Sequence, residues 1–439
     1  MSAATQQFAS ELYALTEQLY PICRSITGEG VRQTLRHIAK YIPLKIHEVP
    51  TGTRVFDWEV PKEWNIRSAF IRDSRGRIVV DFKDHNLHVV NYSVPFRGRL
   101  KLEELRPHLH SIPEHPDWIP YRTTYYRPDW GFCLPHRLLE QLAEDEYEVV
   151  VDTSLENGSL TYGECFLPGA SASEVLFSCH VCHPSLANDN LSGIAVATFL
   201  AQQLGRRPAR YYSYRFLFLP GTIGSIAWLS LNRDHVKFIR HGLVLTCLGD
   251  SAPLTYKRSR RGNAEIDRAA THLMTHRGLA HRVREFTPYG YDERQYCSPG
   301  FNLPVGCLMR SVHGEFPEYH TSADNLQFIH AEQLADALQF CLDLVHVLEH
   351  NAAYRNTQPY GEPQLGKRGL YRSTGGPRID EENLALLWVL NLSDGEHRLL
   401  DIAGRAGIPF HVIHQAAEKL RAAGLLELVA LPDQALEPA

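Results

Sequence analysis

The sequence has no apolar run that approaches the ~18 residues needed for a membrane-spanning helix. Its first 25 residues, MSAATQQFASELYALTEQLYPICRS, lack the basic and then apolar segments of a secretory signal peptide. An excess of one charge is also missing, since 45 basic and 50 acidic residues give a net charge of −5. This balance disfavours a nucleic acid or an acidic membrane as a partner. These absences together predict a cytoplasmic location.

Glycine and proline are not enriched, at 30 and 26 of 439 residues, which excludes collagen-like and low-complexity chains. The cysteines number nine, an odd count, in a chain without an export signal. We therefore expect reduced and mostly buried thiols rather than a disulfide framework. With 44% hydrophobic and 22% charged residues the composition is globular, and the length predicts two or three domains.

The hydrophobic pattern predicts the order of the domains. Apolar residues recur at three- and four-residue steps over residues 8–41, which predicts helices, and we assign residues 1–44 to the same domain as residues 120–355. Short alternating segments within 45–119 predict a small β-rich insertion. From 120 to 355, apolar strands alternate with apolar helices, which predicts an α/β domain around a mainly parallel mixed sheet. Asn157-Gly158 lies between two alternating runs and predicts a β-hairpin.

The C-terminal part reads as a separate unit. Residues 351–378 contain three prolines and five glycines, which predicts a linker over 356–379. Residues 380–439 follow the order helix, turn, helix and strand, which is typical of a winged helix. This segment holds ten acidic and four basic residues, whereas DNA binding needs a basic face. We therefore expect it to pack on the preceding domain or to contact another subunit.

Histidine and aspartate cluster where a predicted strand ends and a predicted helix begins. The stretch HVCHPSLANDNLSG contains His180, His183 and Asp189, and the carboxyl ends of strands carry the ligand sites of such sheets. Far downstream, EFPEYHTSADN places His320 among carboxylates before another helix. Imidazole and carboxylate are ligands for zinc, iron and manganese. If the two stretches meet at one sheet edge, they form a site for a single divalent metal, with zinc the first choice.

These residues also allow three other interpretations. Cys179-x-x-Cys182-His183 matches the c-type haem attachment pattern, but that chemistry belongs outside the cytosol. A zinc knuckle would need a second cysteine pair with matching spacing, which the sequence lacks. In the third interpretation the histidines only form hydrogen bonds within a packed core.

Three motifs taken together resemble a known family. HPSLANDNLSG at 183–193, DERQYCSPG at 292–300 and EYHTS at 318–322 are similar to bacterial aminopeptidase-like proteins with a C-terminal winged helix. Their core resembles the zinc aminopeptidases and glutaminyl cyclases, and such proteins often occur among polysaccharide or secondary-metabolite biosynthesis genes. The resemblance covers nearly the whole chain. It implies a sheet of the zinc-aminopeptidase type.

The resemblance implies metal ligands at His180, Asp189 and His320, with His183 as a spare ligand in place of His180. It also places Asp292 at the position of an acid in a loop before the last strand. Two departures stand out. Gly221-Thr222 occupy the place of two adjacent glutamates, a general base and a ligand, and Thr246 occupies the place of a liganding aspartate. These losses predict one metal rather than two.

The lost glutamate leaves the general base to another acid, and three acids in nearby loops are candidates: Asp250, Glu293 and Glu318. We choose Glu293 because the adjacent Asp292 would push one of the two pKa values toward neutrality, where a base works best. Asp292 or Glu293 would also hold an amine or shuttle a proton.

These residues predict a metal-dependent hydrolase of an amide or peptide bond, with a small-molecule or peptide substrate. An aminopeptidase, or an amidase or deacylase of a biosynthetic intermediate, fits this description. The alternative is a non-catalytic metal-binding or assembly protein on a degenerate peptidase fold, which the lost glutamates favour. A DNA-binding regulator rests only on the winged helix and is opposed by its acidity. Association into a homo-oligomer is left open.

Overall fold

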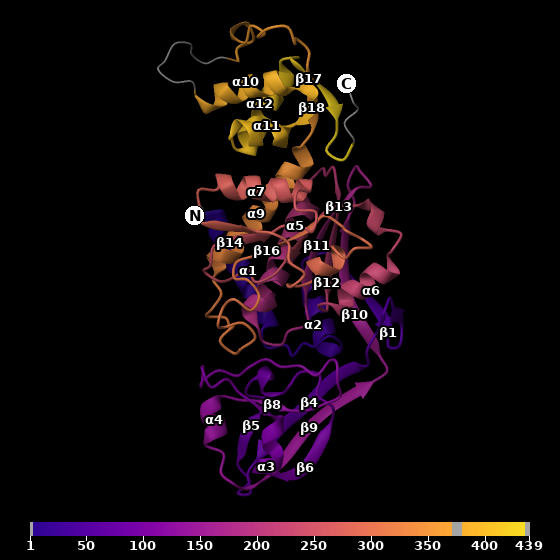
Figure 1. The fold of residues 1–439 in the computed structure, drawn as a ribbon, viewed down its shortest axis with the longest axis vertical. Helices are drawn as coiled ribbons and strands as arrows, with labels where there is room; N and C mark the ends of the chain where they lie inside the picture. Colours follow the sequence, from indigo (N-terminus) through magenta and orange to yellow (C-terminus); the bar gives the residue numbers. More distant parts are fainter. Residues whose placement is uncertain (1–2, 371–379, 435–439) are drawn as a thin grey trace.

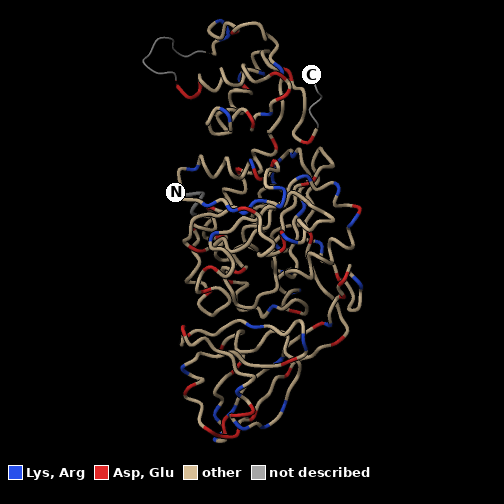
Figure 2. The backbone as a smooth tube through the Cα atoms, viewed as in Figure 1, with Lys and Arg blue, Asp and Glu red and all other residues tan. Residues whose placement is uncertain are grey.

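A computed structural model describes residues 3–370 and 380–434. The molecule is elongated, with three tiers along its long axis (Figure 1). An α/β domain forms the middle tier, a β-rich unit lies at one end and a helical unit at the other. Acidic and basic residues are interspersed over all three tiers (Figure 2).

Eight strands form the central sheet, in the order β1-β10-β12-β11-β13-β16-β14-β15. Their bounds are β1 Lys45–Pro50, β10 Ser159–Leu167, β12 Ser213–Leu219, β11 Glu174–His180, β13 Ile239–Leu245, β16 Val305–Met309, β14 Leu254–Lys257 and β15 His281–Arg284. The four central strands, β12 to β16 in this order, are parallel, whereas β10 and β14 run antiparallel to their central neighbours. Every residue of β11, β12 and β16 is buried, as expected for strands covered on both faces. The mainly parallel mixed sheet is confirmed.

Helices cover both faces of this sheet (Figure 1). One face packs against a shared apolar cluster with α1 Ala3–Leu19, α2 Glu29–Ile38, α5 Gly193–Arg206, α7 Glu265–His276 and α9 Ala331–His350. The other face packs against α6 Ile223–Leu231 and α8 Glu293–Tyr296. Successive residues of β11 alternate between these faces, so Phe177 and Cys179 join the first cluster and Leu176 joins the second. Among the described helices, none is both long and apolar enough to span a membrane.

The β-rich unit has its own sheet and its own core. Its strands are β5 Ile78–Asp81, β4 Glu63–Arg72, β9 Glu146–Glu156 and β6 Phe96–Lys101, in that order across the sheet. The remaining short elements near it are β2 Arg54–Val55, β3 Trp58–Glu59, α3 Leu102–Leu105, β7 Leu109–His110, β8 Phe132–Cys133 and α4 His136–Glu140.

The structure moves both boundaries expected for the 45–119 insertion. Residues 45–50 belong to the central sheet, because β1 pairs antiparallel with β10 along its whole length. Beyond residue 119, the long strand β9 pairs with both β4 and β6 and so completes the smaller sheet. These pairings join segments distant in sequence, and alternating hydrophobicity does not specify the partner of a strand.

The hairpin predicted at Asn157-Gly158 is wrong. The two flanking strands, β9 and β10, lie in different sheets, so the chain crosses from the small sheet to the large one at this point. A type I′ hairpin turn requires positive φ at both central residues, and neither residue has it. Glycine is needed here for another reason, since a Cβ atom on Gly158 would lie 2.6 Å from Cβ of Glu63 in β4.

The C-terminal unit has winged-helix architecture. Its helices are α10 Glu381–Leu392, α11 Leu399–Ala406 and α12 Phe410–Ala422, and its strands are β17 Ala353–Asn356, β18 Asp394–Arg398 and β19 Leu426–Ala430. Because β17 is the central strand of this small sheet, the unit begins at residue 353, before the expected linker and within the last residues assigned to the α/β domain. Part of that linker, residues 371–379, lies outside the described chain, as do residues 435–439.

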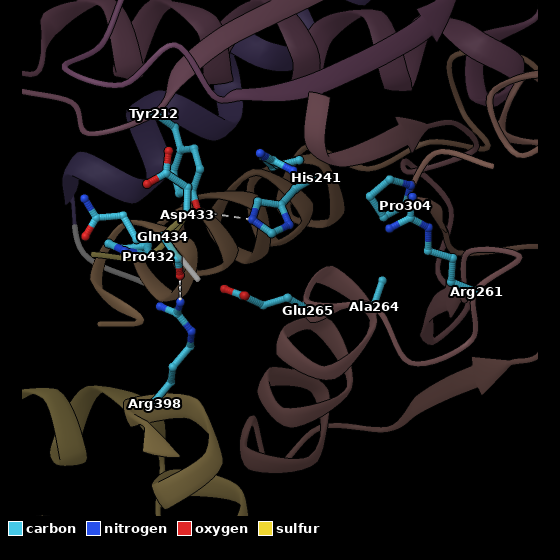
Figure 3. Close-up of a pocket in the computed structure, with 11 residues that line it drawn as sticks. Tyr212, His241, Arg261, Ala264, Glu265, Pro304, Arg398, Pro432, Asp433 and Gln434 are labelled. Atoms are coloured by element: carbon cyan, nitrogen blue, oxygen red, sulfur yellow. Dashed lines mark hydrogen bonds between the residues drawn. The ribbon is translucent and has the colours of Figure 1, made fainter. Parts of the chain in front are cut away.

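Polar contacts fasten the winged-helix unit to the central domain. Asn351, fully buried just after α9, donates to Glu265 of α7 at 2.9 Å and accepts from the backbone N–H of Leu400 at 2.8 Å. Arg398 donates to the carbonyl oxygens of Asn351, Leu431 and Gln434. A cavity of about 430 Å³ remains at this junction, with Arg398 approaching it from the winged-helix side (Figure 3).

Replacing Asn351 should weaken this junction. Asn351→Ala leaves the buried N–H of Leu400 without its acceptor, which typically costs ~1–3 kcal/mol. We expect a lower urea midpoint in equilibrium unfolding of the full chain. Asn263→Ala, at an exposed position, is the control and should leave the midpoint unchanged. Equal midpoints for both variants would show that Asn351 does not stabilise the junction.

Candidate metal centre

The predicted ligands converge at the carboxyl end of the central strand β11. His180 is its last residue, and strand alternation turns its side chain to the face covered by α6 and α8. Asp189 lies in η3 Ala187–Ser192, a short irregular turn that precedes α5, where its backbone dihedral angles depart from helical values. His320 comes from the loop between β16 and α9 and has a positive φ of 56°.

Asp189 lies at the centre of this group. Its Oδ1 atom is 2.8 Å from Nε2 of His180, while its Oδ2 atom is 3.1 Å from Nε2 of His320 and 3.4 Å from Nδ1 of His183. The side chains of His180 and Asp189 have no exposed surface and that of His183 is 6% exposed, whereas that of His320 is 32% exposed. Solvent therefore reaches the group from the side of His320.

Oδ2 of Asp189 and Nε2 of His320 are both buried, and although they lie 3.1 Å apart they form no aligned hydrogen bond with one another or with another described residue. Buried polar atoms nearly always form hydrogen bonds. A buried carboxylate oxygen and a buried imidazole nitrogen that face one another without an aligned hydrogen bond therefore need a structural reason. A cation coordinated by both would supply the missing partner, and imidazole with carboxylate is a donor set that suits zinc. The residues present fit a divalent metal.

The protonation states also suit metal binding. Burial lowers the pKa of His180 to about 3, against the opposing effect of Asp189, so its imidazole is neutral. Burial alone would raise the pKa of Asp189, but the nearby His183 and His180 outweigh this and hold the pKa well below its usual value. Neutral imidazole and ionised carboxylate are the forms that ligate a metal.

A second layer of hydrogen bonds holds the Asp189 turn in place. Asp324 accepts from the backbone N–H groups of Asn188 and Asp189 at 2.6 and 2.9 Å. Asn188 in turn donates to Asp250 at 2.7 Å, and Asp250 also accepts from Ser311. Asp250, expected as a base candidate, thus serves as an anchor of the ligand turn, and its carboxylate makes no contact with the three histidines.

Aromatic rings that the sequence analysis missed enclose the histidines. The ring of Tyr291 stacks on His180 with centroids 3.6 Å apart, and its hydroxyl lies 3.3 Å from Nε2 of His183. Tyr121 meets His183 and His320 edge-on, and Tyr319 stacks on His320 at 3.9 Å. The only sequence signal for two of these rings was adjacency, since Tyr291 precedes Asp292 and Tyr319 precedes His320.

The haem and zinc-knuckle interpretations do not fit this arrangement. Cys179 lies in the apolar cluster on one face of the sheet, whereas Cys182 lies in the cluster on the opposite face. Cys182 Sγ accepts a hydrogen bond from the backbone N–H of Gly221. Two thiols on opposite faces of a sheet cannot bind one haem or one zinc ion.

The comparisons agree with this architecture. Residues 13–351 match the family described as domain of unknown function DUF4910, and residues 352–428 match a winged helix-turn-helix family. The chain belongs to the DUF4910 family. It is 52% identical over 426 residues to a Clostridium acetobutylicum protein with the provisional name polysaccharide biosynthesis protein with aminopeptidase-like domain, and the match covers 97% of this chain and 98% of that protein.

Solved structures show the fold of this DUF4910 chain. A Clostridium acetobutylicum crystal structure, provisionally described as a peptidase, has a TM-score of 0.93 at 50% identity and covers 97% of each chain. A zinc aminopeptidase from Bacillus subtilis has a TM-score of 0.56 at 14% identity and covers 77% of this chain and 94% of its own. The predicted aminopeptidase-like fold with a C-terminal winged helix is confirmed.

In this DUF4910 chain Tyr291 fills the space beside Gly221, at the position where the family resemblance implies a glutamate. A Cβ atom on Gly221 would lie 2.4 Å from the hydroxyl of Tyr291, so no larger side chain fits at this position. The backbone N–H of Thr222 donates to Asp292 at 2.7 Å, and the hydroxyl of Thr246 contacts Nε2 of His313 at 3.1 Å. Aromatic and hydroxyl groups thus occupy the side of the centre where the family resemblance implies carboxylates.

The other three acids considered for catalysis differ in their surroundings. Glu293 is fully buried and paired with Lys257 at 2.6 Å, and its carboxylate also accepts from the backbone N–H of Tyr291. Asp292 uses Oδ1 to accept from Thr222 and Ser225, but its buried Oδ2 has no partner. The carboxylate of Glu318 has no hydrogen bond or ion pair within the part of the chain that is described.

Asp189 also belongs to a second group, with Cys247 and His313, whose ligand atoms all lie within 4.8 Å of one another. The first group, His180, His183 and Asp189, meets the same criterion. The sequence analysis did not consider Cys247 or His313, because neither lies in a motif with metal-ligand spacing. Because it belongs to both groups, Asp189 could be a ligand in either, and the two groups cannot both bind a metal without sharing it.

Metal content provides the direct test of the centre. We expect protein purified without added metal, and then supplied with zinc, to hold one equivalent, and Asp189→Asn to reduce this to background because the shared ligand is weakened. His281→Ala, an exposed histidine on β15, is the control and should keep the full content. Elemental analysis measures both. A second equivalent that disappears in Cys247→Ser would contradict the single-metal prediction.

Proposed function

We propose that this protein is a metal-dependent hydrolase of an amide bond. The observation that carries the proposal is the Asp189 carboxylate shared among His180, His183 and His320, with unpaired buried atoms that a divalent cation would satisfy. The zinc aminopeptidase fold supports the same reaction class. When bound, a divalent metal lowers the pKa of a water molecule and polarises a carbonyl group, which are the two requirements of amide hydrolysis.

The side chains around the centre have distinct parts in this proposal. His180, Asp189 and His320 hold the metal, and His183 is the fourth donor. Burial keeps the pKa of Tyr291 well above its usual value, so its hydroxyl stays protonated and is available to donate a hydrogen bond to a substrate oxygen. The exposed side of His320 is where a substrate would enter.

Asp292 is the acid that we assign to proton transfer, in place of Glu293. Burial raises the pKa of Asp292 to about 7, which suits a group that must accept and release a proton near neutrality. Its Oδ2 atom is unpaired, whereas the carboxylate of Glu293 is occupied by Lys257. Tyr291 precedes Asp292 in the sequence and stacks on His180, so Asp292 directly follows a residue that contacts the histidines.

Kinetics of acid variants test this assignment. We expect Asp292→Asn to keep its metal and to lower kcat by about 10²–10⁴-fold, the usual contribution of general acid–base catalysis. The base form of Asp292 is lost as pH falls through about 7, so wild-type kcat/KM should fall in that range and Asp292→Asn should flatten the change. Release of 4-nitroaniline from aminoacyl 4-nitroanilides, and of amine from N-acyl substrates, provides the assays.

Asp234→Asn, on the exposed surface, is the matched control and should retain the wild-type rate. The assignment fails if Glu293→Gln or Glu318→Gln lowers kcat while Asp292→Asn does not. It also fails if Asp292→Asn loses metal in proportion to its loss of rate, because the residue would then support the site rather than transfer a proton.

A second function, assembly without catalysis, is favoured by one observation. Tyr291 fills the space beside Gly221 where a side chain would project, so the chain has no room for the acid that the family resemblance implies there. A protein that binds zinc but hydrolyses neither the aminoacyl 4-nitroanilides nor the N-acyl substrates would fit this second function. We propose no nucleic-acid partner, because the winged-helix unit is acidic and its helix α12 faces α9, with the rings of His414 and His350 4.4 Å apart.

A further inference from the structure

A second cavity, of about 590 Å³, lies on the α6 and α8 face of the central sheet. Its size is that of a small-molecule site. Thr222, at the start of α6, lines it, and the preceding residue Gly221 packs against Tyr291, whose ring stacks on His180. The Tyr291 ring therefore lies between this cavity, which we call the arginine pocket, and His180 of the metal centre.

The charged residues of the arginine pocket are both cationic. Arg260 and Arg294 line it, and no aspartate or glutamate does, although the whole chain carries a net charge of −5. Among the described residues neither arginine lies within 4.0 Å of an acid, although the charge of Arg294 acts on the nearby buried carboxyl of Asp292 and partly offsets the rise that burial causes in its pKa. Unpaired guanidinium groups that share a cavity favour a carboxylate or phosphate, which their planar donors can bind in bidentate fashion.

The hydrogen bonds of these arginines leave most donors free. Arg294 makes one long contact, from Nη2 to the hydroxyl of Thr222 at 3.4 Å, and its buried Nε atom has no partner. Arg260 donates from Nη1 to Asn302 at 2.9 Å. The Nε atom is too buried for a ligand to reach, so a ligand in the cavity would bind Arg294 through the Nη atoms of its guanidinium group.

Aromatic rings form the rest of the pocket wall. Trp58, on the β2–β3 hairpin of the β-rich unit, meets Tyr126 edge-on with centroids 6.1 Å apart. Their exposed fractions are 39% and 79%, large values for aromatic side chains, and Phe286 lines the same cavity. Exposed aromatic surface gathered at a concave site is typical of ligand recognition, and these rings suit a flat ring in the ligand.

We propose that the arginine pocket binds the part of the substrate that carries an anionic group beside a flat ring. This inference rests on the proposed amide hydrolase and narrows its substrates to small anionic, ring-bearing amides. The anion pairs with Arg294 and Arg260, and the ring lies against Trp58 and Tyr126. The amide then reaches the histidines around the Tyr291 ring, from the exposed side of His320.

Binding of simple probes tests the pocket without a turnover assay. We expect phenyl phosphate or benzoate to bind the full chain saturably in isothermal titration calorimetry, and phenol and inorganic phosphate to bind more weakly. The arm with the lower dissociation constant identifies the anion as phosphate or carboxylate. Arg294→Gln should weaken that binding by about 10–100-fold, as expected for hydrogen bonds to a charged group.

Matched variants separate the pocket from other sites. Arg260→Gln changes an exposed side chain without risk to the fold and should also weaken binding, whereas Arg261→Gln, the next residue and not part of this pocket, should have no effect. Trp58→Leu should weaken phenyl phosphate or benzoate but not inorganic phosphate. Absence of saturable binding, or equal losses in Arg294→Gln and Arg261→Gln, would overturn the proposal.

The metal centre itself could attract an anion, so the titrations are repeated with Asp189→Asn. Binding that survives in Asp189→Asn and is lost in Arg294→Gln supports the arginine pocket, even if no amide is hydrolysed. Binding that is lost in Asp189→Asn and retained in Arg294→Gln would place the anion at the metal centre and refute the pocket. Failure of the pocket and failure of the hydrolase are thus distinguished.

Discussion

A carboxylate with no exposed surface, that of Asp189, determines how the centre of this protein is built. An isolated charge at such a depth would be very unfavourable, so the surroundings must favour its ionised form. Three imidazoles face its two oxygens, and the backbone N–H groups of its own turn are held by Asp324. Burial raises the pKa of Asp324 to about 8, so that carboxyl can stay neutral beside Asp189. The three imidazoles and Asp324 thus together hold the ligand turn in place.

The position of that carboxylate follows from the central sheet. His180 ends a strand that is buried on both faces, and the turn carrying Asp189 leads directly into the buried helix α5. Parallel strands bring their carboxyl ends to one edge, where loops from distant parts of the chain meet. Tyr291 reaches this edge from the loop before α8, and His320 from the loop before α9. A rigid sheet therefore supports a site assembled from loops.

Much of this arrangement was predictable from sequence, and the reasons for the failures are physical. The ligand set His180, Asp189 and His320 was implied by the family resemblance, and the place of the first cluster after a predicted strand agreed with a site at the sheet edge. The boundaries of the β-rich unit were not predictable in this way, since β9 reaches its partners β4 and β6 only through long-range pairing. Tyr291 was missed because a stacking contact leaves no spacing signal, and the pairing of Glu293 with Lys257 was missed because it joins residues 36 positions apart.

Helix α9 links the two ends of the domain. Its 20 residues span about 30 Å, at 1.5 Å per residue. The loop before it carries His320, and the chain after it enters β17, the central strand of the winged-helix sheet, within a few residues. A continuous helix resists bending, so it acts as a strut between these two points. A rotation of the winged-helix unit would therefore be transmitted along this helix to the loop that carries His320 in the middle of the molecule.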